Sequence, residues 1–147
     1  RQMCIRDRAL AGHPRIRAIK DCGGSPAKTQ ALIADGRLAV LAGEDAQMFT
    51  TLALGGTGAI AASAHWQAPQ FVELVALLRR GQLAEARHVW QALLPWVEMC
   101  FAEPNPAPLK AVLAKAGWMR NELRAPMMPA SEALLQRLQA LPGFSRP

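Results

Sequence analysis

The feature that most restricts the fold of this chain is an alternation of short apolar runs with helical segments. The apolar runs, each short enough for one buried strand, occupy residues 15–20, 38–42 and 58–62. The segments between them, 26–35 and 46–54, have the spacing and the end signals of helices. A strand–helix–strand–helix–strand order at this spacing predicts βα units with a parallel sheet, so the expected fold class is α/β.

Local signals mark the ends of these two helices. Ser25 is a good cap residue, Pro26 suits the first helical position, and Gly36 suits the residue that follows a helix. Asp45 is expected to cap the second helix. We favour that interpretation over an acid–base pair with Glu44, because adjacent carboxylates in a βα turn are more often a cap and a solvated neighbour.

The rest of the chain is predicted to be helical. Apolar residues at three-to-four spacing predict helices over 69–80 and 83–101, and Pro95 predicts a kink in the second. In the proline-rich stretch 103–108, Asn105 is expected to cap a helix that begins at Pro106. A last helix is predicted over residues 131–141, after a loop with two prolines.

These elements suggest a division into three parts. Residues 1–8, "RQMCIRDR", have no period, cap or turn signal, and we interpret them as a non-native leader that resembles translated adapter sequence. Residues 9–66 carry the three strands, and 67–147 carry the later helices. Three parallel strands cannot cover both faces and both edges of their sheet, so we expect them to be part of a larger sheet.

Composition argues against several classes of protein. The formal net charge is +6, but the basic residues are scattered rather than clustered with aromatics, which disfavours a nucleic-acid surface. No run of about 18 apolar residues predicts a membrane span, and the start does not resemble a secretory signal, so the cytoplasm is expected. The three cysteines and three histidines lack zinc-ligand spacing, which favours reduced thiols and no metal site.

Lys20 is the strongest candidate for a chemical role. It ends the first predicted strand, on the same face as Ile16 and Ala18. In α/β barrels catalytic groups gather at the carboxyl ends of strands, and burial there favours the neutral amine that can attack a carbonyl. The alternative is a surface lysine at a strand end. A loose GxGxxA pattern over residues 56–61 is not read as a dinucleotide motif, because it follows a helix and opens a strand.

Five segments, in order and with matching spacing, resemble the dihydrodipicolinate synthase and N-acetylneuraminate lyase family. They are "IRAIKDCGGSPAK" (16–28), "VLAGED" (40–45), "LGGTGAIAASAH" (54–65), "EPNPAPLK" (103–110) and "LRAPMMP" (123–129). The first three resemble the regions of strands six, seven and eight of the family's (β/α)8 TIM barrel. The last two are similar to the synthase branch in particular. The resemblance therefore implies the C-terminal part of such a barrel, followed by a C-terminal helical extension.

The resemblance implies roles for three residues. Lys20 would form a Schiff base with pyruvate, Gly43 would line the site, and Ile60 would lie beside the lysine through its backbone carbonyl. The sialic-acid lyases usually carry an acidic residue where this chain has Ala46, which disfavours a lyase. His65 stands where synthases commonly have asparagine, a departure that would alter the pocket wall.

The implied activity is condensation of pyruvate with aspartate semialdehyde, in lysine and diaminopimelate biosynthesis, without metal or organic cofactor and in a homotetramer. The alternatives are a family member that acts on a keto-sugar acid and a non-enzymatic helical fragment. The family's threonine pair, tyrosines and substrate arginine lie outside the matched segment, and the chain has no tyrosine. We therefore expect the isolated chain to be inactive.

Overall fold

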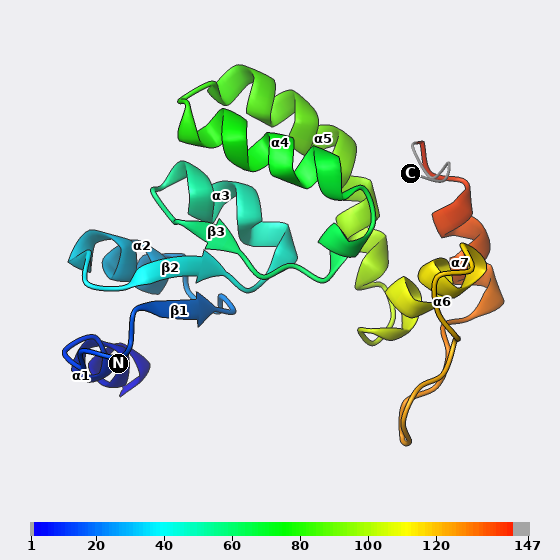
Figure 1. Cartoon of the computed structure of the whole chain (residues 1–147), viewed down its shortest axis with the longest axis horizontal. Helices are drawn as coiled ribbons and strands as arrows, with labels where there is room; N and C mark the ends of the chain where they lie inside the picture. Colours follow the sequence, from blue (N-terminus) through cyan, green and yellow to red (C-terminus); the bar gives the residue numbers. More distant parts are fainter. Residues whose placement is uncertain (1, 143–147) are drawn as a thin grey trace. The chain divides into compact units, whose positions relative to one another are not determined.

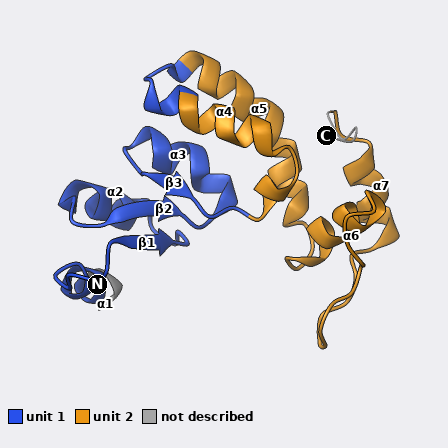
Figure 2. Ribbon diagram, in the orientation of Figure 1, with its two compact units in different colours: residues 1–61, 77–83 blue, residues 62–76, 84–147 orange. Residues whose placement is uncertain are grey.

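The computed structural model of the chain describes residues 2–142 (Figure 1). The chain divides into two compact units (Figure 2). The first unit comprises Arg1–Ala61 and Leu77–Leu83, and the second comprises Ala62–Ala76 and Ala84–Pro147. The division predicted after residue 66, between the three strands and a part with the final barrel helix and the C-terminal extension, stays a prediction; residue 1 and residues 143–147 lie outside the described residues.

The first unit contains a three-stranded sheet. Its strands are β1 (Ala18–Asp21), β2 (Ala39–Ala42) and β3 (Gly58–Ala59), hydrogen-bonded in that order. Both pairings are parallel, with Lys20 opposite Leu41 and Leu41 opposite Gly58. The predicted α/β class with a parallel sheet is confirmed, although β3 is shorter than the predicted 58–62.

The α-helices of the first unit are α1 (Gln2–Leu10), α2 (Pro26–Asp35) and α3 (Met48–Ala53). The ends predicted for α2 are confirmed: the Ser25 side chain accepts a hydrogen bond from the Lys28 amide, and Gly36 adopts a left-handed φ of 70°. The helix predicted over 46–54 is instead a 3-10 turn (Asp45–Gln47) followed by α3. The cap assigned to Asp45 is wrong by one residue, because Glu44 holds the cap position and Asp45 lies buried in the turn.

Residues 2–8, which have no helical period or cap in the sequence, form most of α1. Asp7 of this helix reaches the next one, with its Oδ2 at 3.4 Å from Lys28 Nζ. The interpretation of residues 1–8 as a leader stays a prediction.

Helices cover one face of the sheet. Both α2 and α3 contact β2, and the side chains of Val40 and Ala42 on this face are each 2% exposed. Leu32 of α2 and Leu52 of α3 complete the apolar layer. On the opposite face Ala18 and Lys20 of β1 are exposed to solvent. We call these the helix-covered face and the open face.

The second unit is helical. A 3-10 turn (Ser63–His65) precedes α4 (Ala68–Arg79), which is followed by α5 (Leu83–Cys100), α6 (Ala107–Lys115) and α7 (Glu132–Gln139). The four predicted helices are confirmed to within a few residues. Asn105 does not cap α6: Pro106 holds that position, after a turn in which the Ala107 amide donates to the Pro104 carbonyl.

Tryptophans form an important part of the core of this unit. Trp66 and Trp96 are each 2% exposed, with ring centroids 6.4 Å apart, and the ring of Trp118 lies 5.4 Å from that of Trp66. The Trp96 indole nitrogen donates to the Ser63 carbonyl at 2.9 Å. This bond joins α5 to the turn before α4.

The start of α7 is held by two side chains. Ser131 Oγ accepts a hydrogen bond from the Leu134 amide, which makes it the helix cap. Glu103, from the proline-rich stretch before α6, accepts from both Ser131 Oγ (2.5 Å) and the Ser131 amide (2.9 Å). These bonds lower the pKa of Glu103, because they favour its charged form.

The described residues contain neither a helix suited to span a membrane nor a cluster of metal ligands. None of the helices within 2–142 has the length and apolarity needed to cross a membrane. In the same residues no three His, Cys, Asp or Glu side chains gather as they would around a metal ion. The expected absence of metal chemistry stays a prediction.

Candidate functional site

Lys20 lies near the carboxyl end of β1, on the open face of the sheet. It is the third of the four residues of the strand and pairs with Leu41. Because side chains alternate along a strand, the side chains of Lys20 and Asp21 point to opposite faces of the sheet. The lysine amine is thus exposed on the open face, whereas Asp21 is 4% exposed on the helix-covered face.

Gly43 lies directly under the Lys20 side chain. It follows β2, and its amide donates to the Asp21 carbonyl at 2.7 Å. A Cβ added at Gly43 would stand 2.7 Å from Lys20 Cγ and 2.8 Å from Lys20 Cε. Contacts that short do not occur between carbon atoms, so the lysine takes its path only because residue 43 has no side chain.

Ile60 lies one residue beyond β3. Its amide donates to the Ala42 carbonyl at 2.8 Å, which continues the ladder past the strand. Extending the register by two residues from the row of Lys20, Leu41 and Gly58 puts Ile60 level with Gly43 on the open face. The three residues proposed from sequence therefore meet at the carboxyl end of one sheet, which leaves their chemical roles as predictions.

Cys22 is a fourth residue at this end, although the cysteine pattern of the sequence predicts only a reduced thiol there. A Cβ on Gly43 would stand 2.9 Å from Cys22 Sγ, so the thiol shares the space above Gly43 with the lysine stem. The sequence did contain a signal for it. Cys22 is two residues after Lys20, and the strand period of two puts both on one face.

The carboxylate of Asp21 is tied to α2 on the helix-covered face. Its Oδ1 accepts from Lys28 Nζ at 3.0 Å, and its Oδ2 accepts from Thr29 Oγ1 at 2.5 Å. Burial alone would lower the pKa of Lys28, but the hydrogen bond and charge of Asp21, together with Asp7, outweigh it and raise that pKa. Asp21 and Lys28 thus form a partly buried ion pair behind the strand that carries Lys20.

His65, the departure from the family pattern, lies in the turn that follows β3. Its Nδ1 lies 2.9 Å from the carbonyl oxygen of Ala62. The residue is exposed, so its imidazole belongs to the surface of this turn.

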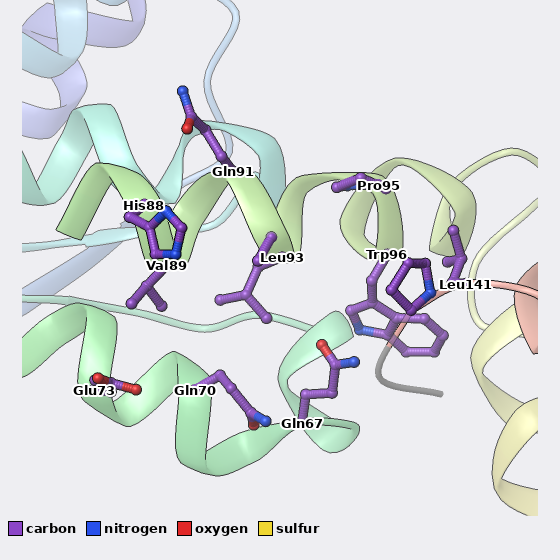
Figure 3. A pocket seen from close by; sticks show the side chains of 12 residues that line it. Gln67, Gln70, Glu73, His88, Val89, Gln91, Leu93, Pro95, Trp96 and Leu141 are labelled. Carbon is purple, nitrogen blue, oxygen red and sulfur yellow. The ribbon is translucent and has the colours of Figure 1, made fainter. Parts of the chain in front are cut away.

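A cavity of about 640 Å³ lies elsewhere, within the second unit (Figure 3). Side chains of α4 and α5 line it, among them Glu73, His88 and Trp96, together with Leu141 and Pro142. It contains no lysine, and none of the residues proposed from sequence borders it. A nucleophilic amine occurs instead at the strand ends, and we therefore assign the candidate site to them.

Comparison with known proteins identifies relatives of the chain. The sequence model of the dihydrodipicolinate synthetase family matches residues 5–141. The 4-hydroxy-tetrahydrodipicolinate synthase 2 of Clostridium acetobutylicum is 36% identical over 134 residues, which cover 89% of this chain and 47% of that protein. The chain thus spans about half the length of the curated relatives that it matches.

Solved structures agree with the sequence match. Dihydrodipicolinate synthase from Thermotoga maritima superimposes with a TM-score of 0.86 at 31% identity, over 92% of this chain and 48% of that one. The chloride-inhibited enzyme from Acinetobacter baumannii, solved with pyruvate, gives a TM-score of 0.87 at 27% identity, over 92% and 47%. With most of its length matched in sequence and in structure, the chain belongs to the dihydrodipicolinate synthetase family.

Proposed function

We propose that this chain supplies the lysine-bearing end of a pyruvate-dependent class I aldolase. The observation that carries the proposal is the position of Lys20 over Gly43, at the carboxyl ends of parallel strands and on the open face. An amine on this face is accessible to a carbonyl substrate, because the helices pack on the other face of the sheet. In α/β barrels this end of the strands holds the catalytic groups.

We assign β1, β2 and β3 to strands six, seven and eight of a (β/α)8 barrel. The parallel order and the single helical layer support this assignment, because barrel strands carry helices outside and side chains inside. The open face of the sheet would then be the barrel interior. The solved relatives continue over the half that this chain does not match, which would provide the remaining wall.

In the proposed reaction, Lys20 acts as the nucleophile. Its neutral amine attacks the ketone carbon of pyruvate, and loss of water gives an imine. The imine accepts the electron pair when a methyl proton leaves, which forms an enamine. The enamine carbon then bonds to the aldehyde carbon of the second substrate, and hydrolysis returns the free lysine. The imine itself serves as the electron sink, so the proposal includes neither metal nor organic cofactor.

The substrates are proposed from the relatives. The Acinetobacter baumannii structure contains pyruvate, and the curated relative from Clostridium acetobutylicum is named for synthesis of the hydroxy-tetrahydrodipicolinate. We accordingly propose pyruvate and aspartate semialdehyde, a role in lysine and diaminopimelate biosynthesis, a cytoplasmic location and a homotetrameric whole protein. For the isolated 147-residue chain we propose no turnover, since it has no tyrosine to relay protons.

The test is reductive trapping with pyruvate. A fusion in which residues 9–142 replace the matching segment of the Thermotoga maritima synthase is treated with pyruvate and borohydride, and its peptides are mapped by mass. We expect an adduct on Lys20, none on Lys28, Lys110 or Lys115, and none after Lys20→Ala. Lys115→Ala, in α6, is the control that should leave trapping unchanged. A folded fusion without an adduct on Lys20 would refute the proposal, and a panel of aldehydes would separate aspartate semialdehyde from sugar-derived acceptors.

A further inference from the structure

Lys20 and Asp21 are neighbours in sequence but lie in different environments. The lysine side chain is on the open face, and the Asp21 carboxylate is 4% exposed on the helix-covered face. Asp21 is also the last residue of β1, so no further ladder pairing holds the strand beyond it. Beyond the pairings of Lys20 with Leu41 and of Asp21 with Ala42, restraint on this end of the strand comes from residue 21 and from the loop that follows.

Besides its place in the ladder with β2, residue 21 makes three further hydrogen bonds. Its carboxylate accepts from Lys28 at 3.0 Å and from Thr29 at 2.5 Å, and both donors belong to the start of α2. Its carbonyl accepts from the Gly43 amide at 2.7 Å. One residue thus connects the end of β1 both to α2 and to Gly43, the glycine that the lysine stem crosses.

The close packing of the Lys20 stem on Gly43 makes the position of the lysine amine sensitive to small movements of β1. Lys20 Cγ and Cε already occupy the space where any Cβ at residue 43 would stand. A shift or rotation of the strand end would therefore drive the stem into Gly43 or lift it away. Either movement displaces the amine, and a displacement of about 1 Å can reduce the rate of a positioned reaction by ~100-fold.

From this geometry we propose that Asp21 is a positioning residue for Lys20: its carboxylate, held by Lys28 and Thr29 behind the sheet, fixes the end of β1 and keeps the lysine amine over Gly43. The catalytic consequence rests on the proposed aldolase function; the positioning itself does not. Asp21 touches no reacting atom, and it acts through the strand. The raised pKa of Lys28 is in keeping with a lysine that stays charged across the neutral range.

The positioning is tested on the 147-residue chain by nuclear Overhauser contacts between the Lys20 side-chain protons and the α-protons of Gly43. We expect these contacts in the native chain and their loss in Asp21→Ala. Asp7→Ala is the matched control, because Asp7 also pairs with Lys28 but belongs to α1 and not to β1. We expect this control to retain the contacts. Contacts of native intensity in a folded Asp21→Ala chain would overturn the proposal.

A second pair of variants applies if Asp21→Ala does not fold. Thr29→Val keeps the shape of the side chain but removes the hydrogen bond to Asp21, and Thr29→Ser keeps the hydroxyl. Weakened contacts in Thr29→Val that Thr29→Ser restores would support the proposal. Native contacts in Thr29→Val would overturn it.

The fusion described above separates positioning from folding. At saturating pyruvate, the first-order rate of trapping on Lys20 should fall by about tenfold in Asp21→Ala, with the half-saturating pyruvate concentration unchanged. A purely structural role would reduce the amount of labelled protein and leave the rate unchanged, which would contradict the proposal. If the parent fusion forms no adduct, the aldolase function fails, and the nuclear Overhauser contacts still decide whether Asp21 positions the lysine.

Discussion

Gly43 is required by the side chain of Lys20 and not by its own backbone. The glycines with positive φ, whose backbone disfavours other residues, are Gly23, Gly24, Gly36, Gly55, Gly81 and Gly117. Gly43 is not among them, so alanine could adopt its backbone conformation. What excludes a Cβ is the lysine stem and the Cys22 thiol, both under 3 Å from where that atom would stand.

Gly43→Ala is therefore expected to impair the lysine more than the fold. The added methyl group must displace Lys20 or Cys22, whose side chains are the flexible partners. In the fusion we expect pyruvate trapping on Lys20 to fall by at least tenfold, while the thermal midpoint shifts little. Gly12→Ala, which meets only an ordinary contact at 3.4 Å, is the control. Equal trapping in both variants would show that the absence of a Cβ at residue 43 is not needed for the reaction of Lys20.

The ion pair of Lys28 predicts a loss of stability in alkali. The folded-state pKa of Lys28 is raised above the ordinary value of 10.5, so its contribution is complete below that pH and disappears as the pH rises through the folded value. We expect urea unfolding, followed by circular dichroism from pH 8 to 12, to lose stability above about pH 10.5 more steeply in the native chain than in Lys28→Met. Lys115→Met, at an exposed position of α6, should behave as the native chain does. The absence of tyrosine removes one competing titration.

At the scale of elements, local chemistry decided which boundaries were predictable. Both ends of α2 follow from Ser25, Pro26 and Gly36, because a cap, a helix-compatible proline and a left-handed glycine act within one turn. The same reasoning was wrong by one residue for two caps, that of the 3-10 turn after β2 and that of α6. At those points the preceding turn, and not the capping residue, determines where the helix begins.

Elements that depend on distant partners could not be predicted from local signals. The strand β3 has only two residues, although the apolar run continues to residue 62, and among the described residues it pairs with β2 alone. The contact of Asp7 with Lys28 joins α1 to α2, and no periodicity in residues 1–8 indicates it. The candidate site was more accessible to sequence, since Lys20 ends a predicted strand and the family resemblance implies Gly43 and Ile60 beside it.

Glu103 connects two elements that are far apart in sequence, and this connection predicts an acid-sensitive helix. Hydrogen bonds from the Ser131 hydroxyl and amide lower the pKa of Glu103 below its ordinary 4.5. The stabilisation is present above that value and is lost as the pH falls through the folded pKa. We expect amide hydrogen exchange in α7 to accelerate below about pH 4.5 in the native chain and to depend less on pH in Glu103→Gln.

The matched control for this experiment is Glu98→Gln, an exposed glutamate of α5. Glutamine at 103 can still accept one bond from Ser131 but has no charge to titrate. An acid response of α7 that is the same in Glu103→Gln and in the native chain would contradict the role given to this carboxylate.

At the scale of the whole molecule, the sheet within residues 2–142 has two unpaired edges and an open face. Among the described residues, β1 and β3 each pair on one side only, and the open face bears Lys20 and the half-exposed Ile60. Unpaired strand edges beside apolar surface favour association between chains. The fold class was predictable from residues 15–62, whereas what covers this surface is not encoded in them.

We therefore expect the isolated 147-residue chain to self-associate. Size exclusion with light scattering should give masses above 15.9 kDa that increase with concentration. Ala18→Lys, which adds a charge to the exposed edge strand β1, should reduce this association. A monomer at all concentrations, with a cooperative thermal transition, would contradict the prediction.

The four tryptophans, at 66, 90, 96 and 118, all belong to the second unit, and the first unit has none. With tyrosine also absent, emission excited at the tryptophan absorption band comes from the second unit alone. Intrinsic fluorescence followed during denaturation will thus report on one half of the molecule, whereas backbone dichroism reports on both. A difference between the two curves would measure how independently the lysine-bearing sheet unfolds, without any label.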